Sequence, residues 1–141
     1  MKFDKLPLVA ALAVALFSAP GAKAAPVDIG VVDDAGKAIL GDAEHGATVF
    51  HKCAICHSVQ AGANRIGPSL HGVVGRHSGT VEHFNYSAAN KNSGIVWTAQ
   101  KIFEYLKAPQ KMVPGTKMAF PGLPEAQDRA DVIAYLEANS K

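Results

Sequence analysis

The stretch that decides the fold is Cys53-Ala54-Ile55-Cys56-His57, which holds both cysteines of the 141-residue chain. Two thiols three residues apart lie on one side of a helical turn, so both can add to the two vinyl groups of a single haem. The next residue then projects its imidazole toward the iron. Cys-x-x-Cys-His is the pattern of covalent haem attachment, and it predicts one haem c bound through Cys53 and Cys56, with His57 as the proximal iron ligand.

Two other chemistries use a Cys-x-x-Cys pair. A thioredoxin-like redox pair is expected on a helix that follows a strand, and nothing strand-like precedes Cys53. A zinc site needs a second pair of ligands at finger spacing, which the sequence lacks. Haem attachment is therefore the interpretation that fits the pattern best.

The first residues look like an export signal. Lys2 and Lys5 give a positive start, residues 6–17 are apolar or small, and Ala22-Lys23-Ala24 is a small-x-small cleavage pattern. The apolar stretch is shorter than the roughly 20 residues of a membrane-spanning helix. We predict a cleaved signal peptide over residues 1–24, and an uncleaved membrane anchor is the alternative.

The composition indicates an ordinary globular protein. Hydrophobic residues make up 48% of the chain and charged residues 18%, which is typical of a folded soluble domain rather than a disordered one. The formal net charge is +2, and no basic run is interleaved with aromatic residues. We therefore expect no nucleic-acid partner.

The sixth position on the iron has two candidate methionines outside the leader, Met112 and Met118. Met118 ends the turn-rich stretch Pro114-Gly115-Thr116-Lys117-Met118, and such a loop can carry a thioether across the haem face. A methionine is usually a core filler, and Met112 remains the rival ligand. Histidine–methionine ligation raises the reduction potential and closes the iron, which favours electron transfer over oxygen chemistry.

Hydrophobic spacing predicts a first helix that delivers the cysteines. Asp42 is a good N-cap residue directly after Gly41. Apolar or small residues then recur at i, i+3, i+4 and i+7, at Gly46, Val49, Phe50 and Cys53.

Two more helices are expected beyond residues 61–84, a glycine-rich stretch that is typical of loop. Thr98 caps one helix, which closes before Pro109, and Pro124 lies in the first turn of the other. Their buried stripes are Ala99, Ile102, Phe103 and Leu106 in the first, and Val132, Ile133, Tyr135 and Leu136 in the second. No alternating strand pattern emerges, so the predicted fold class is all-α.

Five stretches together resemble class I cytochrome c, in particular mitochondrial cytochrome c and its soluble bacterial periplasmic counterparts. In chain order they are Cys53-Ala54-Ile55-Cys56-His57, Gly67-Pro68-Ser69-Leu70-His71-Gly72, Tyr86-Ser87-Ala88-Ala89-Asn90-Lys91, Gly94-Ile95-Val96-Trp97 and Pro114-Gly115-Thr116-Lys117-Met118. The resemblance covers residues 41–141, the predicted cytochrome c domain. Residues 25–40 fall outside it, as an amino-terminal extension with three aspartates to which the sequence assigns no role.

The resemblance implies a cytochrome c fold, with helices and long loops wrapped around one covalent haem and the first and last helices crossing at Gly46 and Tyr135. It also implies further cofactor-binding residues. Pro68 matches the proline whose carbonyl accepts the N–H of the proximal histidine. Three others, Arg76, Tyr86 and Trp97, match residues that donate hydrogen bonds to the haem propionates. A further three, Asn90, Tyr105 and Thr116, match a polar network near the methionine sulfur. The residues alone also allow Trp97 and Tyr105 to be ordinary core aromatics. His45, His51, His77 and His83 are expected at the surface, away from the iron.

The function that the resemblance implies is a periplasmic single-electron carrier of a respiratory chain, not an enzyme and most simply a monomer. Its electrons would come from a quinol-oxidising cytochrome bc complex or a dehydrogenase. They would pass to a terminal oxidase, a reductase or a photosynthetic reaction centre, and soluble redox proteins are possible partners too. The alternative class is a haem enzyme or gas sensor, which needs an open iron position.

Charge is unevenly distributed along the chain. Eight basic residues and two acidic ones lie between Lys52 and Met118, whereas both ends of the predicted mature chain are acidic. The resemblance implies a ring of lysines around the haem edge, at Lys52, Lys91, Lys107, Lys111 and Lys117. Such a ring would steer the protein toward acidic partners, and the alternative is an ordinary solvated surface.

Overall fold

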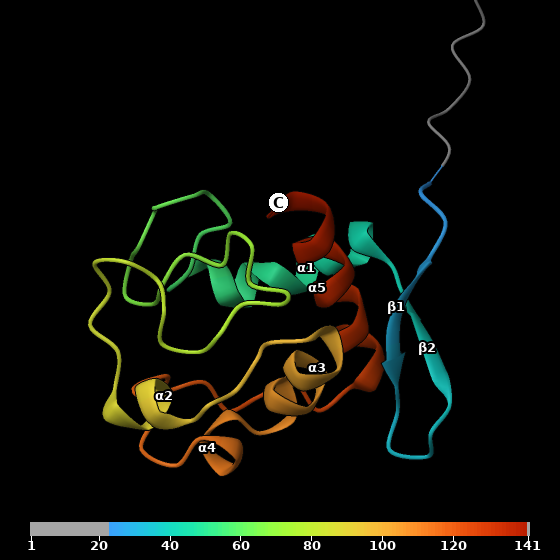
Figure 1. Ribbon diagram of the computed structural model, residues 1–141. Helices are drawn as coiled ribbons and strands as arrows, with labels where there is room; N and C mark the ends of the chain where they lie inside the picture. The colour runs from blue at the N-terminus through green and yellow to red at the C-terminus, as the bar shows by residue number, and fades with distance from the viewer. Residues whose placement is uncertain (1–22, 141) are drawn as a thin grey trace, which may run out of the picture.

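The computed structural model describes residues 23–140 of the chain (Figure 1). Nearly all of the predicted signal peptide, residues 1–24, therefore lies outside the described residues. The described part contains two strands and five helices, β1 (Val27–Val32), β2 (Ala38–Gly41), α1 (Ala43–Ala54), α2 (Ala88–Asn92), α3 (Ala99–Lys107), α4 (Pro109–Met112) and α5 (Ala126–Asn139). None of the helices in residues 23–140 is long and apolar enough to cross a membrane.

The crossing of α1 and α5 is the centre of the fold (Figure 1). Asp42 caps α1 as predicted, because its carboxylate accepts hydrogen bonds from the backbone N–H groups of Glu44 and His45. Gly46 is buried at the crossing, where a Cβ would lie 2.0 Å from the carbonyl oxygen of Asp131 and 2.9 Å from the Cβ of Tyr135. The predicted contact between the first and last helices is confirmed, and glycine is what allows the two backbones to approach.

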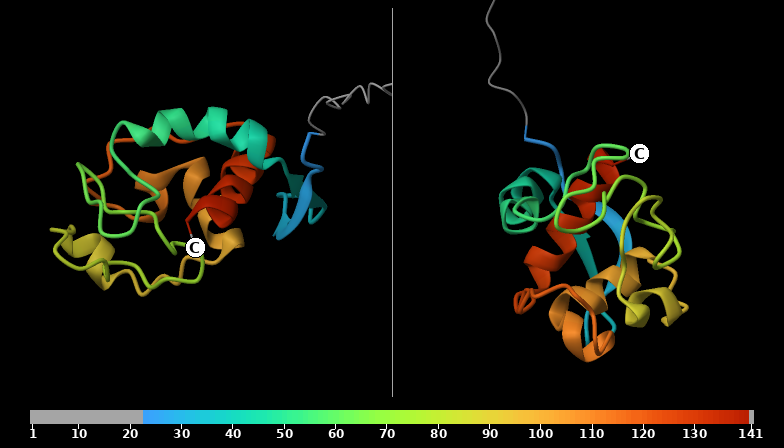
Figure 2. Two further views of the ribbon diagram at one scale, coloured as in Figure 1. Left: turned by 90° about the horizontal axis from the view of Figure 1, so that it is seen from above. Right: turned by 90° about the vertical axis from the view of Figure 1, so that its left-hand side faces the viewer.

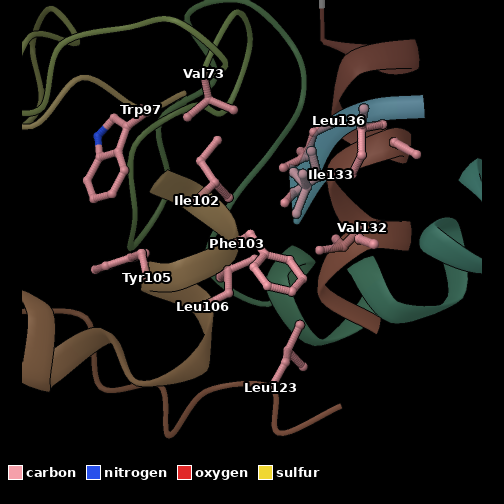
Figure 3. Packing of buried hydrophobic residues seen from close by; sticks show 14 of the residues in the cluster. Val73, Trp97, Ile102, Phe103, Tyr105, Leu106, Leu123, Val132, Ile133 and Leu136 are labelled. Carbon is pink, nitrogen blue, oxygen red and sulfur yellow. The ribbon is translucent and has the colours of Figure 1, made fainter. Parts of the chain in front are cut away.

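The core is formed by side chains of α1, α3, α5 and β1, together with the loop segments that cover them. Phe103 of α3 points toward α5, where Val132 and Ile133 are fully buried (Figure 3). Trp97 and Tyr105 are also buried, on the other side of α3, with their ring centroids 4.7 Å apart. As predicted, α3 ends before Pro109, at Lys107. Thr98 is its N-cap, also as predicted, because the Thr98 side chain accepts a hydrogen bond from the N–H of Lys101.

Two polar side chains of α5 are fully buried, which the hydrophobic pattern did not indicate. The guanidinium of Arg129 donates to the carbonyls of Leu123 and Pro124 at 2.7 and 2.8 Å and lies 4.4 Å from the ring centroid of Phe103. The other is Asp131, whose carboxylate accepts from the N–H of Asp42 and from side chains of His45 and Gln127. Partners of this kind allow charged groups to be buried.

The fold differs from the sequence prediction at both ends. Two predictions are wrong, that the chain has no strands and that nothing strand-like precedes Cys53. The strands β1 and β2 pair antiparallel as a hairpin within and just beyond the 25–40 extension, directly before α1. A bulge between Asp28 and Val31, with Gly30 at φ 66°, interrupts the alternation that would have marked the first strand. Pro124 is also not in the first turn of α5, since it precedes the N-cap Glu125. The predicted helices are all present in residues 42–140, which contain no further strand.

The long segment between α1 and α2 is irregular, as its glycine content predicted. Figure 2 shows that this segment and the hairpin lie at opposite ends of the molecule. The hairpin therefore lies away from the segment that carries Cys56, His57, Pro68, Arg76 and Tyr86.

Candidate functional site

The two cysteines lie at the carboxyl end of α1. Cys53 is in the last turn, and its carbonyl accepts hydrogen bonds from the N–H groups of Cys56 and His57 at 3.0 and 2.9 Å. All three side chains are half-buried. Burial raises the pKa of the Cys53 thiol to about 11, so the thiol is neutral at physiological pH. A thioredoxin-like pair needs the opposite shift, because its reactive species is the thiolate.

The imidazole of His57 is oriented by the next loop. Its Nδ1 donates to the carbonyl oxygen of Pro68 at 2.7 Å, which leaves Nε2 available to a metal. Burial lowers the pKa of His57, against the opposing effect of this bond, so the neutral imidazole that metals require is favoured. The ring also packs on Gly67, where a Cβ would lie 2.3 Å from Cε1 of His57. The sequence assigns no function to Gly67. Its position directly before Pro68 is the feature that could have indicated a contact with the His57 ring.

Arg76 supplies a test of whether the site suits an anionic cofactor. Its Nη1 donates to the carbonyl of His71 at 2.9 Å, while its Nε is buried without a hydrogen-bond partner within residues 23–140. Burial lowers the pKa of the guanidinium, against the opposing effect of Tyr86. Nε of Arg129 is also buried without a partner, so an unused N–H does not by itself mark a cofactor site. Arg76 differs because its half-buried guanidinium lies near His57, where a haem propionate would supply an acceptor for that N–H.

Tyr86 and Trp97 lie near Arg76. The N–H of Trp97 donates to the carbonyl of Arg76 at 2.8 Å, and its side chain is 9% exposed. The hydroxyl of Tyr86 accepts a long hydrogen bond of 3.4 Å from the N–H of Val81. Burial raises the pKa of Tyr86, so this hydroxyl stays protonated and can donate to an anion.

Met118 lies in the loop between α4 and α5. A turn forms its base, with the N–H of Thr116 donating to the carbonyl of Val113 at 3.0 Å and Gly115 at φ 87°. Proline and glycine at the two central positions are typical of a type II turn. The hydroxyl of Tyr105 then donates to the sulfur of Met118 at 3.2 Å. This bond fixes the thioether from the α3 side.

A polar network surrounds that loop. The hydroxyl of Thr116 donates to Oδ1 of Asn90 at 3.0 Å and accepts from the N–H of Met118 at 3.2 Å. Ser87, the N-cap of α2, donates to the same Asn90 oxygen at 2.8 Å. Burial raises the pKa of Tyr105, which keeps its hydroxyl a donor. Met112, the rival ligand, is half-buried against the hydrophobic core.

The predicted site residues therefore form one connected set. His57 is held by Pro68 and lies near Arg76; Arg76 is joined to Trp97 through the backbone, and Trp97 packs on Tyr105 beside Met118. The four histidines expected at the surface, His45, His51, His77 and His83, are exposed. A thiol pair at helical spacing followed by an imidazole is the pattern that binds a haem covalently, and the set around it also contains a thioether and a half-buried cation.

Known proteins match this arrangement. The family model described as "Cytochrome c" matches residues 43–140. Cytochrome c2 of Rhodopila globiformis is 56% identical over 103 residues, which are 72% of this chain and 97% of that protein. Cytochrome c 2.1 of Caenorhabditis elegans is 55% identical over 101 residues, 71% of this chain and 91% of that one. Among solved structures, cytochrome cH from Methylobacterium extorquens aligns with a TM-score of 0.66 and 40% identity, over 70% of this chain and 99% of that one.

The chain belongs to the cytochrome c family. It is accordingly an electron carrier that binds haem c covalently through Cys53 and Cys56 and exchanges electrons with partner proteins. The matched residues begin at Ala43, so the hairpin lies outside the family's shared part.

Proposed function

We propose that the protein is a periplasmic single-electron carrier with its iron held between Nε2 of His57 and Sδ of Met118. When bound, haem c supplies an iron that gains and loses one electron. The observation that carries the proposal is the hydrogen bond from Tyr105 to the Met118 sulfur, since it prepares that thioether, rather than the one of Met112, for a fixed position. A closed site with two protein ligands favours electron transfer over chemistry on a bound gas.

The surrounding residues have separate tasks in this proposal. Pro68 fixes the His57 ring and increases the donor strength of its nitrogen. Arg76, Tyr86 and Trp97 donate to the propionates, and the unused Nε of Arg76 supports that assignment. Asn90 and Thr116 hold the Met118 loop in one conformation.

Replacement of each methionine tests the ligand assignment. Met118→Ala should lower the reduction potential and let the ferrous protein bind carbon monoxide, because the sixth position opens. Met112→Leu is the matched control, and its potential and carbon monoxide reactivity should stay near the wild-type values. If Met112→Leu opened the iron and Met118→Ala left it closed, the two assignments would have to be exchanged.

We infer that the partners are membrane redox complexes that dock on a lysine-rich surface, with a quinol-oxidising cytochrome bc complex or a dehydrogenase as donor. A terminal oxidase, a reductase or a photosynthetic reaction centre would accept the electron. The structure alters the proposed lysine ring in one respect. Lys107 forms an ion pair with Asp34 of the hairpin turn, and Lys52 lies 3.9 Å from Asp128. The side chains of Lys91 and Lys111 are exposed, and they are the stronger candidates for steering.

Export to the periplasm, cleavage of residues 1–24 and a monomeric state complete the proposal. The composition and order of the leader support export. Mass spectrometry of the purified holoprotein would test cleavage, since a mature chain that begins at Ala25 is the expected result. A mass that includes residues 1–24 would favour the membrane anchor instead.

A further inference from the structure

We propose that the amino-terminal hairpin, through α3, positions Tyr105 against the sulfur of Met118 and so helps to keep the sixth iron ligand in place. Gln100 and Lys107 are the positioning residues that join the hairpin to α3. This inference rests on the proposed role of Met118. It gives a task to a segment that lies outside the part of the chain matched by the family.

The hairpin is first fixed to α5. The side chain of Gln127 donates to the carbonyl of Leu40 at 2.8 Å. Gly41 is buried against α5, where a Cβ would lie 2.7 Å from the carbonyl oxygen of Ala130 and 2.7 Å from the Cβ of Ala134. Because α5 is the most buried of the five described helices, it gives the hairpin a rigid base.

From that base the hairpin reaches α3 at both ends of the helix. In the first turn, Oε1 of Gln100 accepts from the N–H of Val32 at 2.9 Å, and its Nε2 donates to the carbonyl of Val32 at 3.2 Å. The side-chain amide thus pairs with the edge of β1 as another strand would. At the last residue of α3, Lys107 forms its ion pair with Asp34. The two glutamine bonds matter more, because an exposed ion pair contributes little.

Between these two attachments, apolar side chains of β1 pack in the same core as those of α3. Ile29 and Val31 of β1 are 6% and 1% exposed and belong to the same buried cluster as Phe103. The hairpin is therefore part of the core rather than a loose extension. Removal of its polar attachments should let it shift on α3 without unfolding the domain.

The position of Tyr105 on α3 connects this packing to the site. At about 100° per residue, Gln100 and Lys107 lie within ~20° of each other around the helix, and Tyr105 lies ~140° from Gln100. Figure 3 shows the result: Tyr105 points to one side of α3, while Phe103 points to the other, toward α5. The helix is held on one face by the hairpin and α5, and on the opposite face it presents the Tyr105 hydroxyl to Met118.

A small displacement of α3 would change the distance and angle of the hydrogen bond from Tyr105 to Met118. The Tyr105–Met118 bond is 3.2 Å long, and hydrogen bonds weaken steeply once distance and angle depart from their preferred values. The ring cannot compensate freely, since it is buried and packs on Trp97 at 4.7 Å. A looser α3 therefore means a thioether that leaves the iron more often.

The test is Gln100→Ala in the full-length holoprotein, with Gln110→Ala as the matched control on the exposed surface of α4. The measurements are the rate of carbon monoxide binding to the ferrous form and the reduction potential. We expect Gln100→Ala to bind carbon monoxide about two- to tenfold faster, the factor that corresponds to one net hydrogen bond, and to have a lower potential. Gln110→Ala should behave as wild type. Asp34→Asn, which removes the ion pair to Lys107, should act in the same direction with a smaller effect.

A double-variant cycle separates this role from general stability. In the Tyr105→Phe background, where the hydroxyl is absent, Gln100→Ala should no longer change the carbon monoxide rate. A purely structural hairpin would lower the urea midpoint of Gln100→Ala and leave the rate and the potential unchanged. That result, or an equal effect with and without Tyr105, would overturn the inference. If Met118 is not an iron ligand at all, the wild-type protein will itself bind carbon monoxide readily. That result differs from the two above, and it would overturn both the proposed function and this inference.

Discussion

The helix crossing at Gly46 allows a prediction in which two opposing effects can be compared. Alanine is the better helix former by about 1 kcal/mol, so Gly46→Ala would stabilise α1 if the surroundings could accept a methyl group. The structure places that Cβ 2.0 Å from the carbonyl oxygen of Asp131 and 2.6 Å from its carbonyl carbon. Ordinary contact begins near 3.4 Å, so the helices would have to separate by roughly 1.4 Å.

The cost of that separation should exceed the gain. The contacted atoms are the backbone of α5, which cannot turn aside as a flexible side chain can, and neighbouring Val132 and Ile133 are fully buried. Overpacking of a core typically costs about 1–3 kcal/mol and more where backbone must move. We therefore expect Gly46→Ala to lower the free energy of unfolding by about 2 kcal/mol after the helix-propensity gain is included.

Urea unfolding of the holoprotein, followed by circular dichroism, measures this directly through the transition midpoint. Thr48→Ala is the matched control, because Thr48 is exposed on the same helix and should be stabilised by a few tenths of a kcal/mol by the same change in propensity. A Gly46→Ala variant as stable as the wild type, or more stable, would refute the close approach of α1 and α5 on which the account of the fold depends.

Three further predictions concern buried charge, pH and salt. Arg129→Met should lower the free energy of unfolding by about 2–4 kcal/mol in the same urea assay, because the carbonyls of Leu123 and Pro124 lose their buried donor; an unchanged midpoint would contradict this. The hydrogen bond to Asp131 raises the pKa of His45 above 6.5, so its stabilising contribution is complete below pH 6.5 and is lost as pH rises through the higher folded-state value. The difference in urea midpoint between wild type and His45→Asn should accordingly shrink from pH 6 to pH 9, and a difference that grows would reverse the sign of the argument. Electron transfer to a membrane partner should slow as salt increases, since electrostatic steering is screened beyond roughly 8 Å at physiological ionic strength. The double variant Lys91→Glu with Lys111→Glu should transfer electrons more slowly than the wild type, with a weaker dependence on salt. A wild-type rate that is flat or rises with salt would indicate apolar docking.

The parts of the fold that the sequence predicted are those with strong local signals. The Asp42 cap, the buried face of α1 and the Thr98 cap follow from side-chain chemistry at fixed spacing, and the structure confirms them. The hairpin could not be predicted in the same way. Its strands have six and four residues, and the bulge at Gly30 breaks their alternation. Its stability comes from α3 and α5, which lie far away in the sequence.

The site shows the same division. The thiol spacing and the histidine after it carry their own chemistry, whereas Pro68 and Tyr105 became site residues through resemblance alone. Gln100 was not predicted as a contributor because its partner, Val32, belongs to a strand that the sequence did not reveal. The buried Asp131 was missed for a related reason, since a helical hydrophobic pattern does not show which charged residues have partners.

The most direct test of the central claim, a closed iron held by His57 and Met118, is the far-red absorption spectrum of the ferric wild-type protein, recorded together with the response of the ferrous protein to carbon monoxide. A methionine–iron bond gives a charge-transfer band in the far red, and the hydrogen bond from Tyr105 should keep that thioether bound. We expect the band to be present and carbon monoxide to leave the ferrous spectrum nearly unchanged. Absence of the band together with ready binding of carbon monoxide would contradict it and would place the protein among haem proteins with an open iron position.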